Sequence, residues 1–422
     1  MRGHGKRRGW LVLAMASALL GGCVTRPTEY HEPPPLSVTE RATLNARVFD
    51  RVWRLIDDKY FDANFRGVNW RALRDRYRPA ALAAADETAL YAVLNRMCAE
   101  LKESHVGALA PRRAFEFQTD HRAAVGIRWQ LLEGKRVVTD VVPGSPAARA
   151  GVQPGWIALS RNGAPLREGE VFVSRVGQPV VYGFLDARNE PRSFSLVPEL
   201  LTFDRREARE LGDRLLYLRF DQFSRQSLSW LSHELKSHAD SPGAIIDLRQ
   251  NSGGNAFVLS VALAEFFPGR VAEGRMVRRN GSQRESRSLS WLSAHYAGHV
   301  VLLTGPATAS AAEIFAHVLQ HHGRAEVVGR QTAGAVIFSR TYRLPDNGTV
   351  QIPVMDYVGL DGQRLEGHGV APDRPVPPPS LADLRAGRDS DVFAAIAVLK
   401  ESISADELPS GDEIQVTPAM AK

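Results

Sequence analysis

The chain has 422 residues, which exceeds one ordinary domain of about 100–200 residues and predicts two or three domains. A hydrophobic content of 44% with 24% charged residues is typical of a globular protein and excludes a disordered, collagenous or coiled-coil chain. The formal net charge of +6 does not indicate a nucleic-acid partner. Four of the 53 basic residues lie within residues 1–22, which contain no acidic residue, so the remainder carries 49 basic and 47 acidic residues, a net charge of +2.

The first 22 residues have the pattern of a signal peptide. Residues 1–9 are basic and residues 10–20 are apolar, but a run this short does not reach the ~20 residues that a membrane-spanning helix needs. The following Leu20-Gly21-Gly22-Cys23 resembles a bacterial lipobox, which implies a signal peptide over 1–22 and lipidation of Cys23. The alternative is a secreted protein in which Cys23 is incidental.

The lipobox resemblance implies a place in the cell. We expect a cell-envelope protein that is lipid-anchored to a membrane and faces the periplasm. Val24 stands where an aspartate often directs retention in the inner membrane, so the outer membrane is slightly favoured. Lipidation of Cys23 leaves Cys98 without a disulfide partner, and the apolar helical pattern around Cys98 predicts that it is buried in a core.

The rest of the chain divides by its periodicity. Residues 23–38 are rich in proline and predict an extended linker. Apolar residues at spacings of three and four predict a helical module over 39–110, and short alternating runs predict a β-rich domain over 111–199. Strand and helix patterns alternate over 200–378, which predicts an α/β core, followed by a C-terminal helix over 379–402 and a polar tail over 403–422.

One loop of the β-rich domain has a recognisable pattern. The sequence PGSPAARAGVQPGW lies between two predicted strands, with Ser145 in position to cap a short helix and Gly151 in position to end it. This arrangement resembles a PDZ domain, which binds peptides by adding a strand to a sheet edge. These domains usually carry Asp where this chain has Trp156. The alternative is a β-rich insert of another kind.

Three segments carry residues suited to acyl-transfer chemistry. A glycine pair, Gly253-Gly254, follows a predicted buried strand, where backbone N–H groups can face an oxyanion. Ser310 stands between a strand and a helix, so it is either a helix cap or an exposed hydroxyl beside free N–H donors. Ser104-His105 ends the helical module with an ionisable imidazole.

Four motifs occur in one order along the chain: DLRQNSGG, TASAAEIFA, HGRAEVVGRQTAG and EGHGVAPD. Together they resemble the carboxyl-terminal processing (tail-specific) serine protease family and its tricorn-type branch. The resemblance implies an α/β fold with a crotonase/ClpP-like layered catalytic core, an N-terminal helical module and an inserted PDZ domain. It also implies a serine-type peptidase that needs no cofactor or metal.

The resemblance further implies which residues catalyse the reaction. The processing branch uses a lysine in T-x-G-K, but this chain reads Thr332-Ala333-Gly334-Ala335, and no lysine occurs between Ser310 and Lys400. The tricorn-type branch instead uses a Ser-His pair and a glutamate, which match residues of this chain. The implied roles are Ser310 as nucleophile, His105 as base, Ser104 and Glu366 as a relay that orients the imidazole, and the Gly253 and Ala311 N–H groups as the oxyanion hole.

Other interpretations of these residues stay open in the sequence. His105 could be a structural histidine, Glu366 could form a surface salt bridge, and His368 could replace His105 as the base. His317, His321 and His322 follow Ser310 on the predicted helix, and we interpret them as a solvated helix face because no carboxylate or cysteine completes a zinc site.

The sequence therefore predicts a membrane-tethered serine endopeptidase. Its partners would be periplasmic or cell-envelope polypeptides, bound in part through carboxyl-terminal segments at the PDZ domain, and the membrane through the lipid anchor. No nucleic-acid partner is expected. The alternative is a catalytically silent pseudo-peptidase lipoprotein that acts as a PDZ peptide-binding scaffold.

Overall fold

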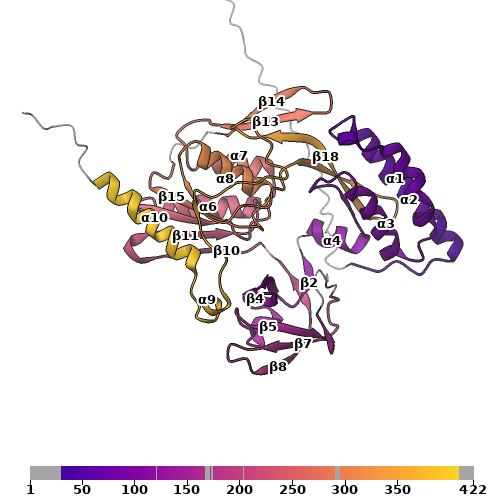
Figure 1. Cartoon of the computed structure of the whole chain (residues 1–422), viewed down its shortest axis with the longest axis horizontal. Coiled ribbons are helices and arrows are strands. Elements are labelled where there is room, and N and C mark those ends of the chain that lie inside the picture. The colour runs from indigo at the N-terminus through magenta and orange to yellow at the C-terminus, as the bar shows by residue number, and fades with distance from the viewer. Residues whose placement is uncertain are drawn as a thin grey trace, which may run out of the picture.

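The computed structural model describes residues 30–119, 121–166, 172, 174–202, 204–289 and 295–407. The predicted signal peptide, Cys23 and most of the polar tail lie outside these residues. Figure 1 shows a helical module on one side of an α/β core, with a β-rich domain below both. The fold class is α/β, as predicted. Within the described residues, no helix combines the length and the hydropathy that crossing a membrane would require.

The helical module contains α1 (Val38–Lys59), α2 (Trp70–Leu82) and α3 (Glu87–Ala99), with a 3₁₀ turn at Phe65–Gly67. Helix α1 starts at Ser37, whose side chain accepts from the Glu40 N–H while the Glu40 carboxylate accepts from the Ser37 N–H. The apolar faces of the helices form a core that includes Cys98, which is buried as predicted. This core also takes in Val350 and Ile352, so the module packs on a sheet of the catalytic region.

That sheet contains β1, β18, β13 and β14 in this order, with β17 paired to β18. Strand β1 follows the helical module, and the others come from later parts of the chain (Figure 1). The bounds of its strands are β1 (Gly107–Leu109), β13 (Ala272–Arg278), β14 (Gln283–Arg287), β17 (Phe338–Arg343) and β18 (Thr349–Val358).

The β-rich domain lies between two short strands that pair with each other, β2 (Arg122–Ala124) and β9 (Glu199–Leu201). Helix α4 (Pro111–Thr119) precedes β2, so the chain enters and leaves this domain at one place. The domain contains β3 (Ile127–Leu132), β4 (Lys135–Val141), α5 (Pro146–Arg149), β5 (Ile157–Arg161), β6 (Ala164–Pro165), β7 (Val180–Leu185) and β8 (Pro191–Leu196).

The loop that predicted a PDZ domain has the local structure expected of it. Ser145 caps α5 by accepting from the Ala148 N–H, and Gly151 follows with φ +82°. Trp156 is buried and packs against Phe184 and Phe194, so it serves the core of the domain. Strand β3 forms one edge of the sheet β3-β4-β5-β7-β8.

The α/β core is a sheet in the order β10-β11-β12-β15-β16-β19, parallel from β11 onward. Side chains alternate between its faces, so one face packs on α6, α7 and α8 and the other on α10. Its elements are β10 (Arg206–Glu210), β11 (Leu216–Phe220), α6 (Arg225–Ser237), β12 (Gly243–Asp247), α7 (Ala256–Leu263), β15 (His299–Thr304), α8 (Ala311–His321), β16 (Glu326–Gly329), β19 (Arg374–Pro375), α9 (Leu381–Arg385) and α10 (Ser390–Glu407).

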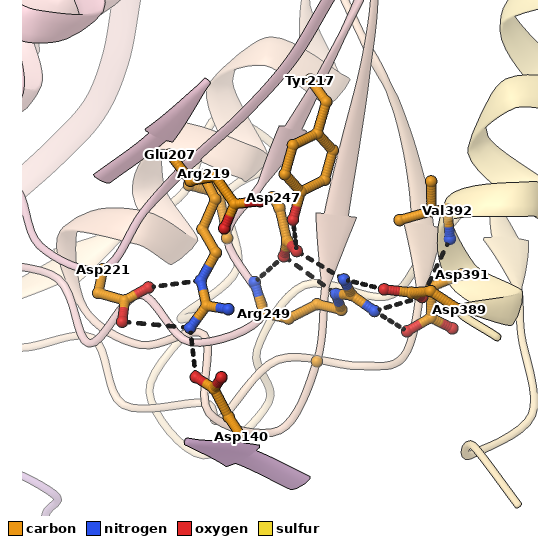
Figure 2. Close-up of polar contacts among 12 residues, drawn as sticks. Asp140, Glu207, Tyr217, Arg219, Asp221, Asp247, Arg249, Asp389, Asp391 and Val392 are labelled. Atoms are coloured by element: carbon orange, nitrogen blue, oxygen red, sulfur yellow. Dashed lines mark hydrogen bonds and ion pairs between the residues drawn. The ribbon is translucent and has the colours of Figure 1, made fainter. Parts of the chain in front are cut away.

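Ion pairs at the carboxyl ends of the parallel strands join the core to the β-rich domain and to α10 (Figure 2). Arg219 of β11 binds Asp140 of the β-rich domain as well as Asp221 of its own loop. Arg249, just after β12, binds Asp389 and Asp391 at the start of α10. The loop that leads into Gly253 is therefore anchored on both sides.

Candidate active site

Ser310 lies on a sharp turn between β15 and α8. Its backbone has φ 57° and ψ −121°, a conformation that costs a non-glycine residue about 1–3 kcal/mol and is concentrated at functional sites. Two hydrogen bonds to the loop after β12 hold the turn. The Thr308 hydroxyl donates to the Leu248 carbonyl (2.8 Å), and the Ala309 N–H donates to the Asn251 carbonyl (3.0 Å). The strained backbone is thus held by the loop after β12.

The Ser310 hydroxyl lies at the helix start in a capping-box position opposite the Glu313 N–H, without a cap hydrogen bond of regular geometry. Within the described residues it makes no hydrogen bond, while the Ser310 N–H donates to the Ala335 carbonyl (3.0 Å) and the Glu313 carboxylate (2.9 Å). The Ala311 N–H likewise donates to no group in the described part of the chain. A free hydroxyl beside a free N–H donor at a helix N-terminus is the arrangement that a serine nucleophile needs.

Gly253 packs directly against this turn. A Cβ atom at Gly253 would lie 2.6 Å from the Ser310 Cβ and 2.8 Å from the Ala309 carbonyl oxygen, and the residue has φ +94°. Only glycine fits such an approach. Its N–H, predicted to serve the oxyanion, donates to Asn251 Oδ1 (2.9 Å). Gly254 follows with φ +142°, and its N–H has no partner within the described residues.

Ser104, His105 and Glu366 form a hydrogen-bonded relay. The Ser104 hydroxyl lies 2.6 Å from His105 Nδ1 and 2.8 Å from Glu366 Oε2. Because the carboxylate can only accept, the Ser104 hydroxyl donates to Glu366 and accepts the Nδ1–H of His105. This assigns the proton to Nδ1 and leaves Nε2 as a bare acceptor, which is the tautomer of a general base.

The imidazole is also kept neutral by its surroundings. Burial lowers the pKa of His105 from its ordinary value of 6.5, and the negative charge of Glu366 partly opposes this by raising it. A base whose pKa lies below 6.5 is unprotonated at neutral pH. Glu366 is 4% exposed and also accepts from the backbone N–H groups of Ser104 and Val336 (2.6 Å each).

Ser310 and His105, the predicted nucleophile and base, line one cavity of about 470 Å³. His105 and Ser310 are not hydrogen-bonded to each other, since no such contact occurs among the described residues; in free enzymes such contacts are often long and tighten with substrate. The cavity is lined in large part by apolar side chains, with polar groups near the catalytic residues. Its other lining residues are Ser104, Phe117, Gln222, Ser252, Gly253, Gly254, Ala256, Leu259, Ala311, Ile314, Val336, Ile337, Phe338, Ser339 and Gln351.

A buried ion pair fixes the segment that carries the base. Glu103, whose side chain is fully buried, binds Arg364 (2.8 Å) and also lies 3.4 Å from Arg66. Arg364 in turn binds Asp356 of β18. Residues 103–105 and 364–366 are therefore joined twice, by an ion pair and by the relay.

Glu313 is a site residue that our reasoning from the sequence missed. Its buried carboxylate accepts from the Thr332 hydroxyl (2.5 Å) and from the N–H groups of Gly334, Ala335 and Ser310 (2.7 to 2.9 Å). It thus ties the turn at Ser310 to the loop 332–335. The available signal was its position three residues after Ser310, where a glutamate reaches back to the helix start.

Ala335 occupies the position where the processing branch has its lysine, and the structure places it against the nucleophile. Its carbonyl accepts the Ser310 N–H, and its methyl side chain has no proton-accepting group. Lys400, the next lysine in the sequence, lies on α10 and pairs with Asp213 (2.6 Å). Neither residue can take the proton of Ser310.

Two histidine interpretations can be compared with the structure. His317 does not belong to a solvated helix face, because it is 7% exposed and its Nε2 accepts the Leu360 N–H (3.0 Å). The prediction was wrong for this residue because the loop 359–366 folds over α8. His368 is exposed, its Nδ1 lies 3.2 Å from the Glu366 carbonyl, and it is not among the described residues that line the cavity.

Comparisons with known proteins match the core that carries Gly253, Ser310 and Glu366, and the helical module that precedes Ser104 and His105. A model of peptidase family S41 matches residues 214–376, and a model of the tricorn protease C1 domain matches residues 45–99. The chain is 27% identical to the carboxyl-terminal-processing protease of Synechocystis sp. over 95% of this chain and 96% of that protein. It is 25% identical to a putative tricorn protease homolog of Streptomyces coelicolor over 81% of this chain and 31% of that protein.

A solved structure supports the fold. The photosystem II D1 C-terminal processing protease aligns with 82% of this chain and 98% of its own, with a TM-score of 0.56 and 22% identity. The chain contains a peptidase family S41 domain and a tricorn protease C1 domain, is similar to carboxyl-terminal-processing proteases over most of its length, and is a serine-type peptidase.

Proposed function

We propose that this protein is an endopeptidase that cleaves polypeptides through an acyl-enzyme on Ser310, with His105 as the base. The observation that carries the proposal is the pairing, in one cavity, of a strained and unbonded Ser310 hydroxyl with an imidazole whose bare nitrogen is fixed by a carboxylate relay.

In the first step, Nε2 of His105 takes the Ser310 proton while Oγ attacks the scissile carbonyl carbon. The tetrahedral intermediate collapses, the C–N bond breaks, and the imidazolium returns the proton to the leaving amine. Water then attacks the ester with His105 again as base, and Ser310 regains its proton. Throughout these steps Glu366 and Ser104 stabilise the imidazolium by hydrogen bonding and charge.

The Ala311 and Gly253 N–H groups are proposed to stabilise the oxyanion. One such donor contributes about 2.7–4 kcal/mol in the transition state. The Ala311 N–H is free, whereas the Gly253 N–H must be shared with, or released from, Asn251. The neighbouring Gly254 N–H is the alternative donor from the same loop.

The test is covalent labelling of the folded protein by a fluorophosphonate at about pH 8, where a histidine base is neutral. Wild type should react, whereas Ser310→Ala should not. Ser252→Ala is the matched control, because Ser252 lines the same cavity and should leave labelling unchanged. No labelling of folded wild type would favour the catalytically silent scaffold instead.

We further propose that the β-rich domain is a PDZ domain that collects substrate segments. The capped helix α5 and the edge of β3, which no other described strand pairs with, support this, because such domains bind peptides by strand addition. The crotonase/ClpP-like relation of the core is proposed with it. Deleting residues 125–198 should weaken the binding of carboxyl-terminal peptides, while binding that is unchanged would contradict the proposal.

Finally, we propose that Cys23 carries the lipid anchor and holds the peptidase at a periplasm-facing membrane, the outer one being slightly favoured. The lipobox sequence supports this. Incorporation of an alkyne fatty acid should be lost in Cys23→Ala, with the protein released into the soluble fraction. Incorporation that persists in Cys23→Ala would contradict the anchor.

A further inference from the structure

The outer edge of β17 is open. This strand pairs with β18 through residues 338–343, and within the described residues its backbone bonds to no other segment. An exposed strand edge presents N–H and C=O groups that can pair with another extended chain. The exposed residues Arg340, Thr341 and Arg343 lie along it.

This open edge begins inside the catalytic cavity. Phe338 and Ser339, the first residues of β17, line the cavity, and the Gln351 side chain donates to the Ser339 hydroxyl (2.6 Å) there. A polypeptide bound at Ser310 can therefore leave the cavity along β17 as one continuous extended segment. The length of β17 allows pairing over several residues.

The edge carries cations without counter-charges. Within the described part of the chain, neither Arg340 nor Arg343 forms an ion pair or a side-chain hydrogen bond, whereas other exposed arginines such as Arg287 and Arg374 are paired with glutamates. Asp346, in the turn after β17, accepts from the Tyr91 hydroxyl (2.9 Å) and does not bind Arg343.

Alternation along the strand places Arg343 on the face of the cavity. Ser339, Thr341 and Arg343 share one face, whereas Tyr342 packs toward the helical module on the other. Arg343 lies four residues beyond Ser339, or about 13 Å along the strand. On a chain paired with β17, the residue opposite Arg343 is therefore about four residues away from the residue opposite Ser339.

We propose that the substrate chain adds to the open edge of β17 and that Arg343 selects an Asp or Glu side chain about four to six residues from the cleavage site. The inference rests on the proposed peptidase function for its location and names the class of substrate: unfolded segments with an acidic residue on one flank. Arg340, on the opposite face of the same strand, adds positive charge.

Binding to the inactive Ser310→Ala protein tests the inference without relying on turnover. The probes are fluorescent 12-residue peptides, blocked at both ends and built from Thr, Val and Ser, with a Glu, Gln or Lys pair near either the amino or the carboxyl end. Anisotropy gives each Kd. The Glu peptide of one flank should bind about three- to tenfold tighter than its Gln counterpart, and added salt should reduce the difference.

Charge reversal then locates the effect. Arg343→Glu should reverse the preference toward the Lys peptide, whereas Arg284→Glu should leave it unchanged. Arg284 is the matched control, an exposed arginine on β14 of the same sheet with no ion pair among the described residues. The same Glu preference in Arg343→Glu, equal effects of both variants, or no preference at either flank would overturn the inference.

The two proposals fail separately. A wild-type protein that is not labelled at Ser310, but whose Ser310→Ala form shows the reversible charge preference, would retain the docking edge and lose the peptidase function. Labelling at Ser310 without a charge preference would retain the peptidase and lose the docking edge.

Discussion

The proposed nucleophile and the proposed base of this site are held in place by different kinds of structure. Ser310 is positioned by the backbone: a turn with a positive φ, an adjacent Gly253, and hydrogen bonds from residues 308 and 309 to the neighbouring loop. His105 is positioned by side chains, through Ser104 to a carboxylate 262 residues away and through the Glu103–Arg364 ion pair beneath it.

The difference predicts different responses to substitution. A backbone-determined turn tolerates no added atoms where another segment packs against it, because the chain has no alternative conformation. In the relay, Ser104 and Glu366 stay hydrogen-bonded to each other when the imidazole is removed, so the loss of His105 leaves neither of them unpaired. Changes at the base should therefore reduce catalysis with little effect on stability, and changes at the turn should affect both.

His105→Ala should have the largest effect on activity. Loss of the general base should lower kcat for a peptide substrate by about 10²–10⁴-fold. The thermal unfolding midpoint should change little, because among the described residues the imidazole is hydrogen-bonded to Ser104 alone. Turnover equal to that of wild type would show that another group takes the proton, with His368→Ala as the control that should remain active.

Gly253→Ala should have the next largest effect. The added methyl group would clash with Ser310 and Ala309, so we expect kcat/KM to fall by about 10²–10³-fold, as when an oxyanion donor is lost. Gly281→Ala is the control, because Gly281 also has a positive φ (+76°) but has open space around it. Gly281→Ala should cost about 1 kcal/mol of stability and no activity. An active Gly253→Ala would contradict the close packing.

Arg364→Met should affect stability more than catalysis. It leaves Glu103 buried with the longer contacts to Arg66 and the Tyr60 hydroxyl (3.4 Å each), so the free energy of unfolding in urea should fall by about 3–5 kcal/mol. Adding Glu103→Gln should recover part of this loss. Arg374→Met, which breaks an exposed pair with Glu326, should cost only about 0–1 kcal/mol. Equal losses of stability in the two variants would mean that the buried Glu103 carboxylate does not need the charge of Arg364.

Local sequence patterns predicted part of the fold. The alternation of strands and helices predicted the α/β core, and the capped helix at Ser145 has the predicted form. The pairing of Ser104, His105 and Glu366 came from resemblance to a family, since nothing local in the sequence indicates a contact across 262 residues.

Other features depend on tertiary packing and could not be read from the sequence. His317 is buried because the loop 359–366 covers α8, which helical periodicity does not reveal. The buried Glu313 carboxylate gathers donors from a loop some twenty residues later. The open edge of β17 exists because of the order of the strands in the sheet, which only the fold determines.

The central claim, that a neutral His105 activates Ser310, is tested most directly by the pH dependence of the fluorophosphonate labelling rate. Burial lowers the pKa of His105 below 6.5. The imidazole is therefore protonated and inactive at acid pH, and it becomes neutral as the pH rises through this lowered pKa. The labelling rate should reach half of its maximum below pH 6.5 and stay level to about pH 8.5. A rate that keeps rising with a midpoint above about pH 8, as an amine base would give, or one that is independent of pH, would contradict the account.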